Sequence, residues 1–244
     1  MRISVNYDFE RRVGLFPAGF DKDGVLYCNQ NFADYPHCIP SGKFDAASQQ
    51  PEWMLLSYQK PVTASSTAEN SSPEWAVNED CRSWWSAAGT EPGEWLCVEQ
   101  PFRGSSSLLR SHWSLPCNGR SAAGSRCDGS CGRHRSCRPG SPPQAFHLPW
   151  VFGNGEGPKP AQAEAAGARV DALDATITWK HIENAQGCNV RYGVAPDKLY
   201  LSWLVYDADE VTLSTLTAGQ EYYVCVDSFN ENGITPGKTF KLEG

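Results

Sequence analysis

The sequence predicts an all-β protein whose C-terminal part is a complete β-sandwich. The chain holds nine Trp, nine Tyr and ten Phe but only two Met, a composition that favours sheets over helical packing. Short alternating segments separated by turns recur through the last 80 or so residues, and a hairpin pattern lies near the start.

The totals allow two modules, or one module plus fragments. The chain has 244 residues, of which 40% are hydrophobic and 20% charged, so it can bury a core. Its net charge of −7 argues against nucleic acid as a partner, because binding phosphates requires a basic surface. No apolar run reaches the roughly 18 residues that span a membrane. The N-terminus lacks the apolar stretch of a signal peptide, which leaves the localisation open between the cytoplasm and secretion as part of a longer parent.

A hairpin is expected near the N-terminus. The apolar run Val13–Phe20 leads into Asp21-Lys22-Asp23-Gly24, which supplies a turn with Gly where a positive φ is needed, and Val25–Cys28 returns. Because a single hairpin is not stable alone in water, it must pack on another part of the protein.

Residues 61–99 combine an aromatic pair with an alternating strand. The strand is Glu94–Glu99, and the pair is Trp84 and Trp85. Either Trp can stack on the apolar face of a sugar ring or fill a core, and both interpretations remain open.

Residues 101–150 have a composition unlike the rest of the chain. They contain ten Ser, seven Arg, six Gly, six Pro and four Cys, and no Lys, Glu, Thr, Val, Ile or Tyr. No sheet strand is expected in a segment without β-branched residues, and so few apolar groups cannot offset the entropy of ordering. Out-of-frame translation of a GC-rich gene produces this bias, so we hypothesise a frameshift after about Glu99 that ends near residues 146–152.

Four cysteines and a histidine in this segment admit three interpretations. Cys117, Cys127, Cys131, His134 and Cys137 have the chemistry of zinc ligands, but their spacing matches no standard finger or ribbon. The alternatives are a set of disulfides and a non-native or disordered segment.

Strand signals return after a linker that begins at Gly153. Residues 156–167 are rich in Gly, Pro and Ala and predict a linker. In the first strand that follows, Ile177 and Trp179 are expected to face inward. The expected strands are Ala175–Trp179, Cys188–Tyr192, Leu201–Tyr206, Val211–Leu213, Tyr222–Phe229 and Thr239–Leu242.

Residues 168–244 resemble fibronectin type III domains. The resemblance rests on Trp179 in an early strand, on the run Leu216–Tyr222 that ends in a corner tyrosine, and on Asn230-Glu231-Asn232-Gly233. It implies a spacer or interaction module, in which Cys188 and Cys225 are expected to be free buried thiols.

Residues 59–155 resemble a discoidin-like (coagulation factor 5/8 C-type) domain, a galactose-binding-like jelly roll, disrupted over about 101–148. The matching motifs are Ala64-Ser65-Ser66, Ala76–Asp80, Ser83–Ser86 and Gly93–Val98. The resemblance implies sugar binding, with Trp84 and Trp85 as candidates, and a structural Ca²⁺ at Asn78, Asp80 and Ser83.

Residues 1–58 resemble the end of the five-bladed propeller of glycoside hydrolase family 43, which contains β-xylosidases and α-L-arabinofuranosidases. The matching runs are Arg11–Phe20 and Leu26–Pro36. The family's catalytic carboxylates lie in earlier blades, so the resemblance transfers no catalytic residue to this chain.

These resemblances together imply a non-catalytic, carbohydrate-binding accessory part of a family 43-like glycoside hydrolase that degrades plant polysaccharide. Its expected partners are a polysaccharide or oligosaccharide and the missing catalytic propeller, with no nucleic acid or membrane partner. Two alternatives stay open: a glycosidase by family membership only, and a fibronectin-like interaction module in a damaged gene product.

Overall fold

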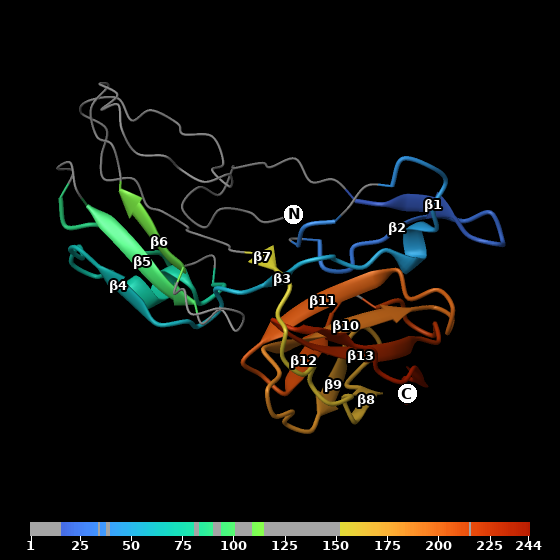
Figure 1. Ribbon diagram of the computed structural model, residues 1–244. Helices are drawn as coiled ribbons and strands as arrows, with labels where there is room; N and C mark the ends of the chain where they lie inside the picture. Colours follow the sequence, from blue (N-terminus) through green and yellow to red (C-terminus); the bar gives the residue numbers. More distant parts are fainter. Residues whose placement is uncertain are drawn as a thin grey trace. The chain divides into compact units, whose positions relative to one another are not determined.

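A computed structural model describes residues 16–33, 35–37, 40–80, 83–89, 94–100, 109–114, 152–214 and 216–244. Within these residues the chain is all-β apart from two short 3-10 helices (Figure 1). The chain divides into two compact units. The described residues 16–56 and 152–244 belong to the first, and 57–114 belong to the second.

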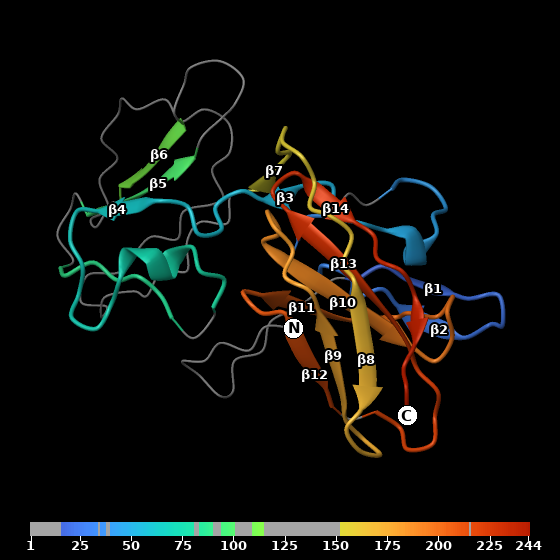
Figure 2. The same cartoon turned by 90° about the horizontal axis from the view of Figure 1, so that it is seen from below.

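Two antiparallel sheets form a sandwich in the C-terminal part of the first unit (Figure 2). One sheet has the order β12–β9–β8, and the other has the order β11–β10–β13–β14, with β15 also paired to β13. The strands are β8 (Ala165–Arg169), β9 (Ala175–Trp179), β10 (Gly187–Gly193), β11 (Leu201–Tyr206), β12 (Glu210–Leu213), β13 (Tyr223–Asn230), β14 (Gly233–Thr235) and β15 (Phe240–Lys241). The chain passes between the sheets three times, after β9, before β12 and after β12, as in Greek-key sandwiches.

Alternation along β9 builds the core between the two sheets. Ala175, Ile177 and Trp179 are buried, with exposed fractions of 0, 0 and 7%. They pack with buried residues of the facing sheet, among them Val190 and Val226. The inward direction of Ile177 and Trp179 predicted from the sequence is therefore confirmed.

The corner tyrosine predicted from the sequence is also present. Tyr222 is buried just before β13, and its hydroxyl oxygen accepts a hydrogen bond from the backbone N–H of Thr217 at 3.3 Å. This bond back to an upstream residue closes the connection that crosses between the sheets. The guanidinium of Arg169, the last residue of β8, lies 5.6 Å from the centre of the Tyr222 ring.

The sandwich starts earlier than the sequence predicts, because β8 lies partly in the segment expected to be a linker. Ala165–Arg169 pairs with all of β9, and Ala163 is 7% exposed in the core. Gly167 lies opposite Ile177, where an added Cβ would come within 2.5 Å of the Ile177 side chain. Ala and Gly have low strand propensity, so they weaken the prediction of a strand here. They are nevertheless required, because the backbone of β8 lies close to the core.

The predicted N-terminal hairpin is confirmed. β1 (Ala18–Phe20) pairs with β2 (Leu26–Cys28), and Gly24 has a φ of +77° in the turn. The Asp21 carboxylate accepts hydrogen bonds from the backbone N–H groups of Asp23 and Val25, both at 2.9 Å, which fixes the turn.

Residues 29–56, which follow the hairpin, belong to the same unit as the sandwich. The sequence predicts instead a separate domain over residues 1–58. A short helix η1 (Ala46–Ser48) is capped by the Asp45 side chain, which accepts from the N–H of Ala47. β3 (Met54–Leu55) then pairs with β7 (Phe152–Gly153). The chain therefore leaves the first unit and returns to it at two paired strands.

The second unit contains a three-stranded antiparallel sheet of order β4–β5–β6. Its elements are β4 (Val62–Ala64), the helix η2 (Pro73–Ala76), β5 (Trp95–Gln100) and β6 (Leu109–Ser114). The expectation that residues 101–150 supply no strand is wrong for β6, which pairs with the whole of β5. A ladder is formed by backbone groups, so it does not require β-branched side chains. No helix in the described residues is long and apolar enough to span a membrane.

Candidate functional site

The outer face of the β10–β13 sheet is unusual because it is both polar and buried. Val190 and Val226 face the sandwich core, so Asn189 and Asp227, their neighbours in the two strands, face the opposite side. Asn189 and Asp227 are nevertheless 0 and 1% exposed. An antiparallel sheet commonly leaves one face in water, so the covered face of this sheet is a candidate functional surface.

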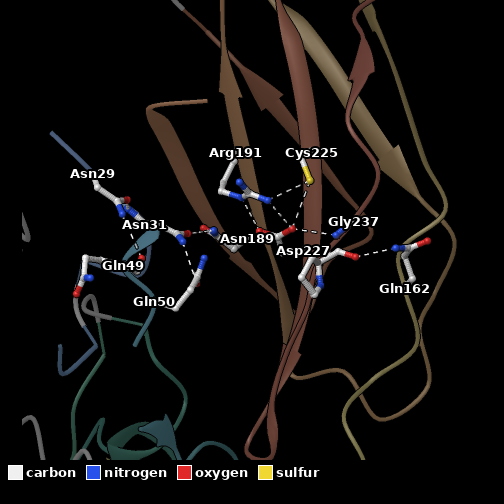
Figure 3. A network of polar contacts seen from close by, with 11 residues as sticks. Asn29, Asn31, Gln49, Gln50, Gln162, Asn189, Arg191, Cys225, Asp227 and Gly237 are labelled. Carbon is white, nitrogen blue, oxygen red and sulfur yellow. Dashed lines mark hydrogen bonds and ion pairs between the residues drawn. The ribbon is translucent and has the colours of Figure 1, made fainter. Parts of the chain in front are cut away.

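An ion pair occupies the middle of this face (Figure 3). Arg191 donates through Nε to Asp227 Oδ2 at 2.5 Å and through Nη2 to Oδ1 at 3.0 Å. The same Asp227 Oδ1 accepts from the backbone N–H of Gly237 at 2.9 Å and from the Cys225 thiol at 3.3 Å. Several donors thus offset the desolvation of the buried carboxylate, as a buried ion requires.

A chain of side-chain amides connects this face to residues 29–50 (Figure 3). Asn189 Nδ2 donates to Asn31 Oδ1, and Asn31 Nδ2 donates to Gln50 Oε1 at 3.0 Å. Asn29 Nδ2 donates to the carbonyl oxygens of Ala46 and Gln49, at 2.7 and 3.1 Å. Among the described residues, Asn189 Oδ1 has no hydrogen-bond partner. The hydrogen bonds from Asn189 to Asn31 and from Asn31 to Gln50 therefore determine how residues 29–50 lie on the sheet.

An aromatic cluster seals the same face beside the amides. Phe32 meets Phe229 edge to face with ring centres 5.2 Å apart, and Tyr35 meets Phe152 at 5.4 Å. Tyr206 packs edge to face on Phe229 at 5.4 Å, and the Tyr206 and Tyr35 hydroxyl oxygens lie 2.7 Å apart. Phe32 and Phe229 are fully buried, so this cluster contributes the apolar part of the contact.

Charged groups fasten the hairpin tip to the loop before β11. Lys198 Nζ lies 2.9 Å from Asp21 Oδ2 and 2.6 Å from Asp23 Oδ2. The bond from Lys198 holds the pKa of Asp21 well below its ordinary value. Tyr27 stacks on Tyr200 with ring centres 4.3 Å apart, next to a pocket of about 230 Å³. Burial, together with a 3.0 Å hydrogen bond to Asp21, raises the pKa of Tyr200 to about 12.

The two thiols predicted to be buried and free, Cys188 and Cys225, are so in the structure. Burial raises the pKa of Cys188 to about 12 and that of Cys225 to about 11. Because the thiolate is the nucleophile and the metal ligand, neither residue is poised for either role.

The residues proposed from the sequence as calcium ligands lie together in one loop. Asn78 Oδ1 accepts from the backbone N–H of Asp80 at 3.0 Å, and Asn78 Nδ2 donates to Ser83 Oγ at 2.8 Å. The Ser83 N–H donates to the Asp80 carbonyl oxygen at 3.2 Å. Among the described residues, this loop included, no group of three or more His, Cys, Asp or Glu could hold a metal ion.

The two candidate tryptophans have different environments. Trp85 is 2% exposed, packs with Ala87 and Leu96, and donates its indole N–H to the Ser66 carbonyl oxygen at 3.1 Å. Trp84 is only partly buried, and its own carbonyl oxygen accepts from the Ser71 hydroxyl at 3.2 Å. Trp85 therefore fills the core in this conformation, which leaves Trp84 as the residue of the pair able to meet a ligand. The possible zinc ligands between Cys117 and Cys137 lie outside the described residues.

Sequence reasoning did not find the covered sheet face. Its signal in β13 is the charged Asp227, which lies in the row of Cys225 and Phe229, opposite to the core-facing row of Val224 and Val226. Asp227 is 1% exposed, and a buried carboxylate requires partners from outside its own strand, as Arg191 and Gly237 provide here.

Two sheets of order β12–β9–β8 and β11–β10–β13–β14, joined through a tyrosine corner, define the C-terminal module. That module is fibronectin type III-like. Solved structures similar to it include the fn3 domain of human contactin 1, at 17% identity over 41% of this chain and 94% of that one, with a TM-score of 0.33. An Fn3-like protein from Clostridium thermocellum is 18% identical over 35% of this chain and 91% of that one, with a TM-score of 0.31.

The FN1-FN3 domains of chicken CNTN1 are 19% identical over 35% of this chain, with a TM-score of 0.29, and the match covers 32% of that structure. No family model and no curated protein matches the chain. The propeller and discoidin-like resemblances therefore remain predictions. The sandwich, by contrast, is supported by the observed strand order of its two sheets.

Proposed function

We propose that the chain is a non-catalytic accessory protein in which the sandwich is a scaffold and residues 57–114 bind polysaccharide or oligosaccharide. The observation that supports this proposal is the partly exposed Trp84, next in sequence to a Trp85 anchored in the core. A partly exposed indole ring can offer its apolar face to a sugar ring. The polar loop of Asn78, Asp80 and Ser83 directly before it supplies hydrogen-bonding groups.

The parent that we propose is a family 43-like glycoside hydrolase acting on plant polysaccharide, whose catalytic propeller the chain would accompany. Two carboxylates of the first unit, Asp227 and Asp21, form ion pairs that stabilise the fold, and this supports a non-catalytic role. Asp227 is paired with Arg191 and also accepts from the Gly237 N–H, and Asp21 is paired with Lys198. Glycoside hydrolysis instead requires two carboxyl groups that flank an open sugar site.

A structural Ca²⁺ at Asn78, Asp80 and Ser83 forms part of the proposal. The donor set fits a hard cation, since it offers a carboxylate, an amide oxygen and a hydroxyl within one loop. The ion would hold this loop in shape beside Trp84. If so, Ca²⁺ raises the melting temperature of the wild-type chain but not that of Asp80→Asn.

Binding of arabinoxylan oligosaccharides to the full chain tests the proposal. By isothermal titration calorimetry we expect binding that falls about tenfold or more in Trp84→Ala, a loss typical of a stacking aromatic. The matched control is Trp53→Ala, which removes a Trp that is 50% exposed in the other unit and should bind as wild type does. Binding that is equal in Trp84→Ala, or absent from the wild type, contradicts the proposal.

An activity assay distinguishes the alternative of a glycosidase from a non-catalytic accessory protein. Turnover of an aryl xyloside or arabinofuranoside by the purified chain would show an enzyme. The remaining alternative, a fibronectin-like interaction module in a damaged gene product, predicts no sugar binding at all.

A further inference from the structure

β11 forms one edge of its sheet, and within the described residues no second strand pairs with it on its outer side. Within the described residues, β10 is the one strand that pairs with β11, in a register from Leu201 opposite Tyr192 to Tyr206 opposite Gly187 (Figure 2). Its other side carries backbone N–H and C=O groups without a ladder partner in the described chain. Such an edge is a template for another strand.

The other edges of the sandwich carry devices that discourage pairing, and β11 does not. β12 contains Glu210, β8 contains Arg169 and β15 contains Lys241. β14 is three residues long and is followed by Pro236. β11, by contrast, reads Leu-Ser-Trp-Leu-Val-Tyr, with no charge, proline or glycine over six residues.

Apolar side chains on this strand are also unusually exposed. Trp203 is 57% exposed and Leu201 is 40% exposed, whereas Val205 in the same row is 8% exposed and reaches the core. Side chains at positions two apart share a face, so Leu201, Trp203 and Val205 form one apolar row. The row begins in the core and extends out of it.

We propose that β11 pairs with β11 of a second copy of this chain, antiparallel and about a two-fold axis at Trp203. Residues directly opposite in an antiparallel ladder point to the same face, so this register sets Trp203 against its own copy and Leu201 against Val205. An isologous contact of this kind closes into a dimer rather than a fibre.

The strand's own sequence identifies a second copy as the occupant. In this register both residues of each facing pair in the row are apolar, and the Trp203 pair adds an aromatic contact at the centre. Because residues 201–206 are uncharged, no like charges meet when the strand faces itself. A short ladder buries little area, so the dimer is a weak one that forms as concentration rises.

Sedimentation velocity of the full chain from about 1 to 200 µM tests the proposal, a range that covers weak dimers. The wild-type chain should shift from monomer to dimer, and Trp203→Lys should remain a monomer throughout. Because Trp203 is 57% exposed, the variant should keep the native circular dichroism spectrum. Val170→Lys is the control, since it places the same charge at a residue that is 67% exposed beyond β8.

Amide hydrogen exchange gives a second readout if Trp203→Lys folds poorly. Exchange across residues 201–206 of the wild type should slow as concentration rises, and Leu201→Lys should remove that change. A wild type that remains monomeric over the whole range overturns the proposal. So does a dimer that persists in both variants, or one with unchanged exchange in β11.

Discussion

Asn189 lies fully buried in a sheet position where a hydrophobic residue would need no partner. Its amide N–H donates to Asn31, 158 residues away in the sequence, while its Oδ1 has no partner among the described residues. A half-satisfied amide contributes little net stability, but the bond it makes can be formed in only one alignment. We interpret this amide pair as the contact that selects the position of residues 29–50 on the sheet.

Replacing Asn189 by Ala should lower the free energy of unfolding by about 1 to 3 kcal/mol, because Asn31 Oδ1 stays buried without a donor. Urea unfolding followed by tryptophan fluorescence measures the change. Asn154→Ala, the same substitution at an exposed residue, should change stability by less than about 0.5 kcal/mol. Equal effects of the two substitutions would show that the Asn31–Asn189 bond is not formed.

The β1–β2 hairpin is held at its tip by charge as well as by ring stacking. Asp21 accepts two backbone N–H groups that shape the turn, and it also meets Lys198 and Tyr200 of the sandwich. The pKa of Asp21 is lower in the folded protein than in the unfolded chain, with Lys198 as the main cause. Its stabilising effect is therefore complete above the unfolded pKa and is lost progressively as the pH falls from there through the lower, folded pKa.

Asp21→Asn keeps the turn's hydrogen-bond acceptor but removes the charge. The variant should be less stable than the wild type at pH 7, and the two should converge as the pH falls below about 4, the ordinary pKa of Asp. Urea midpoints measured between about pH 7 and pH 2.5 test this. Glu156→Gln, at an exposed carboxylate, controls for general charge effects. A gap between wild type and Asp21→Asn that is the same at both pH values contradicts the prediction.

How far each element could be predicted depends on whether its evidence is local. β9 and β11 have the bounds predicted, since alternation of apolar residues is written into a few consecutive positions. The first residues of β8 fall in the predicted linker, because their small side chains are required by the close approach of Ile177, which belongs to another strand. The covered face of β10 and β13 could not be predicted either, because Asn31 and Asn189 are paired only once the fold exists.

At the scale of the first unit, two stretches far apart in the sequence make one folded body. Residues 16–56 cover the outer face of the sandwich through the amide pair, the aromatic cluster and the Asp21–Lys198 ion pair. β3 and β7 pair where the chain leaves and re-enters this unit. Residues 57–150 are therefore an insertion between the two stretches, and cutting the chain within the insertion need not separate the two stretches from each other.

A protease site inserted after the exposed Gln59 tests this arrangement in the full chain. After cleavage, the fragment that contains residues 16–56 should co-elute with the remainder in native size-exclusion chromatography and separate in urea. Phe32→Ala should release it, because losing a fully buried Phe costs about 3 to 5 kcal/mol, a hundredfold or more in affinity. Val25→Ala, at a residue 50% exposed in the same stretch, should leave the fragments together. Native separation of the wild-type fragments would mean that chain connectivity, rather than the buried face, holds residues 16–56 on the sandwich.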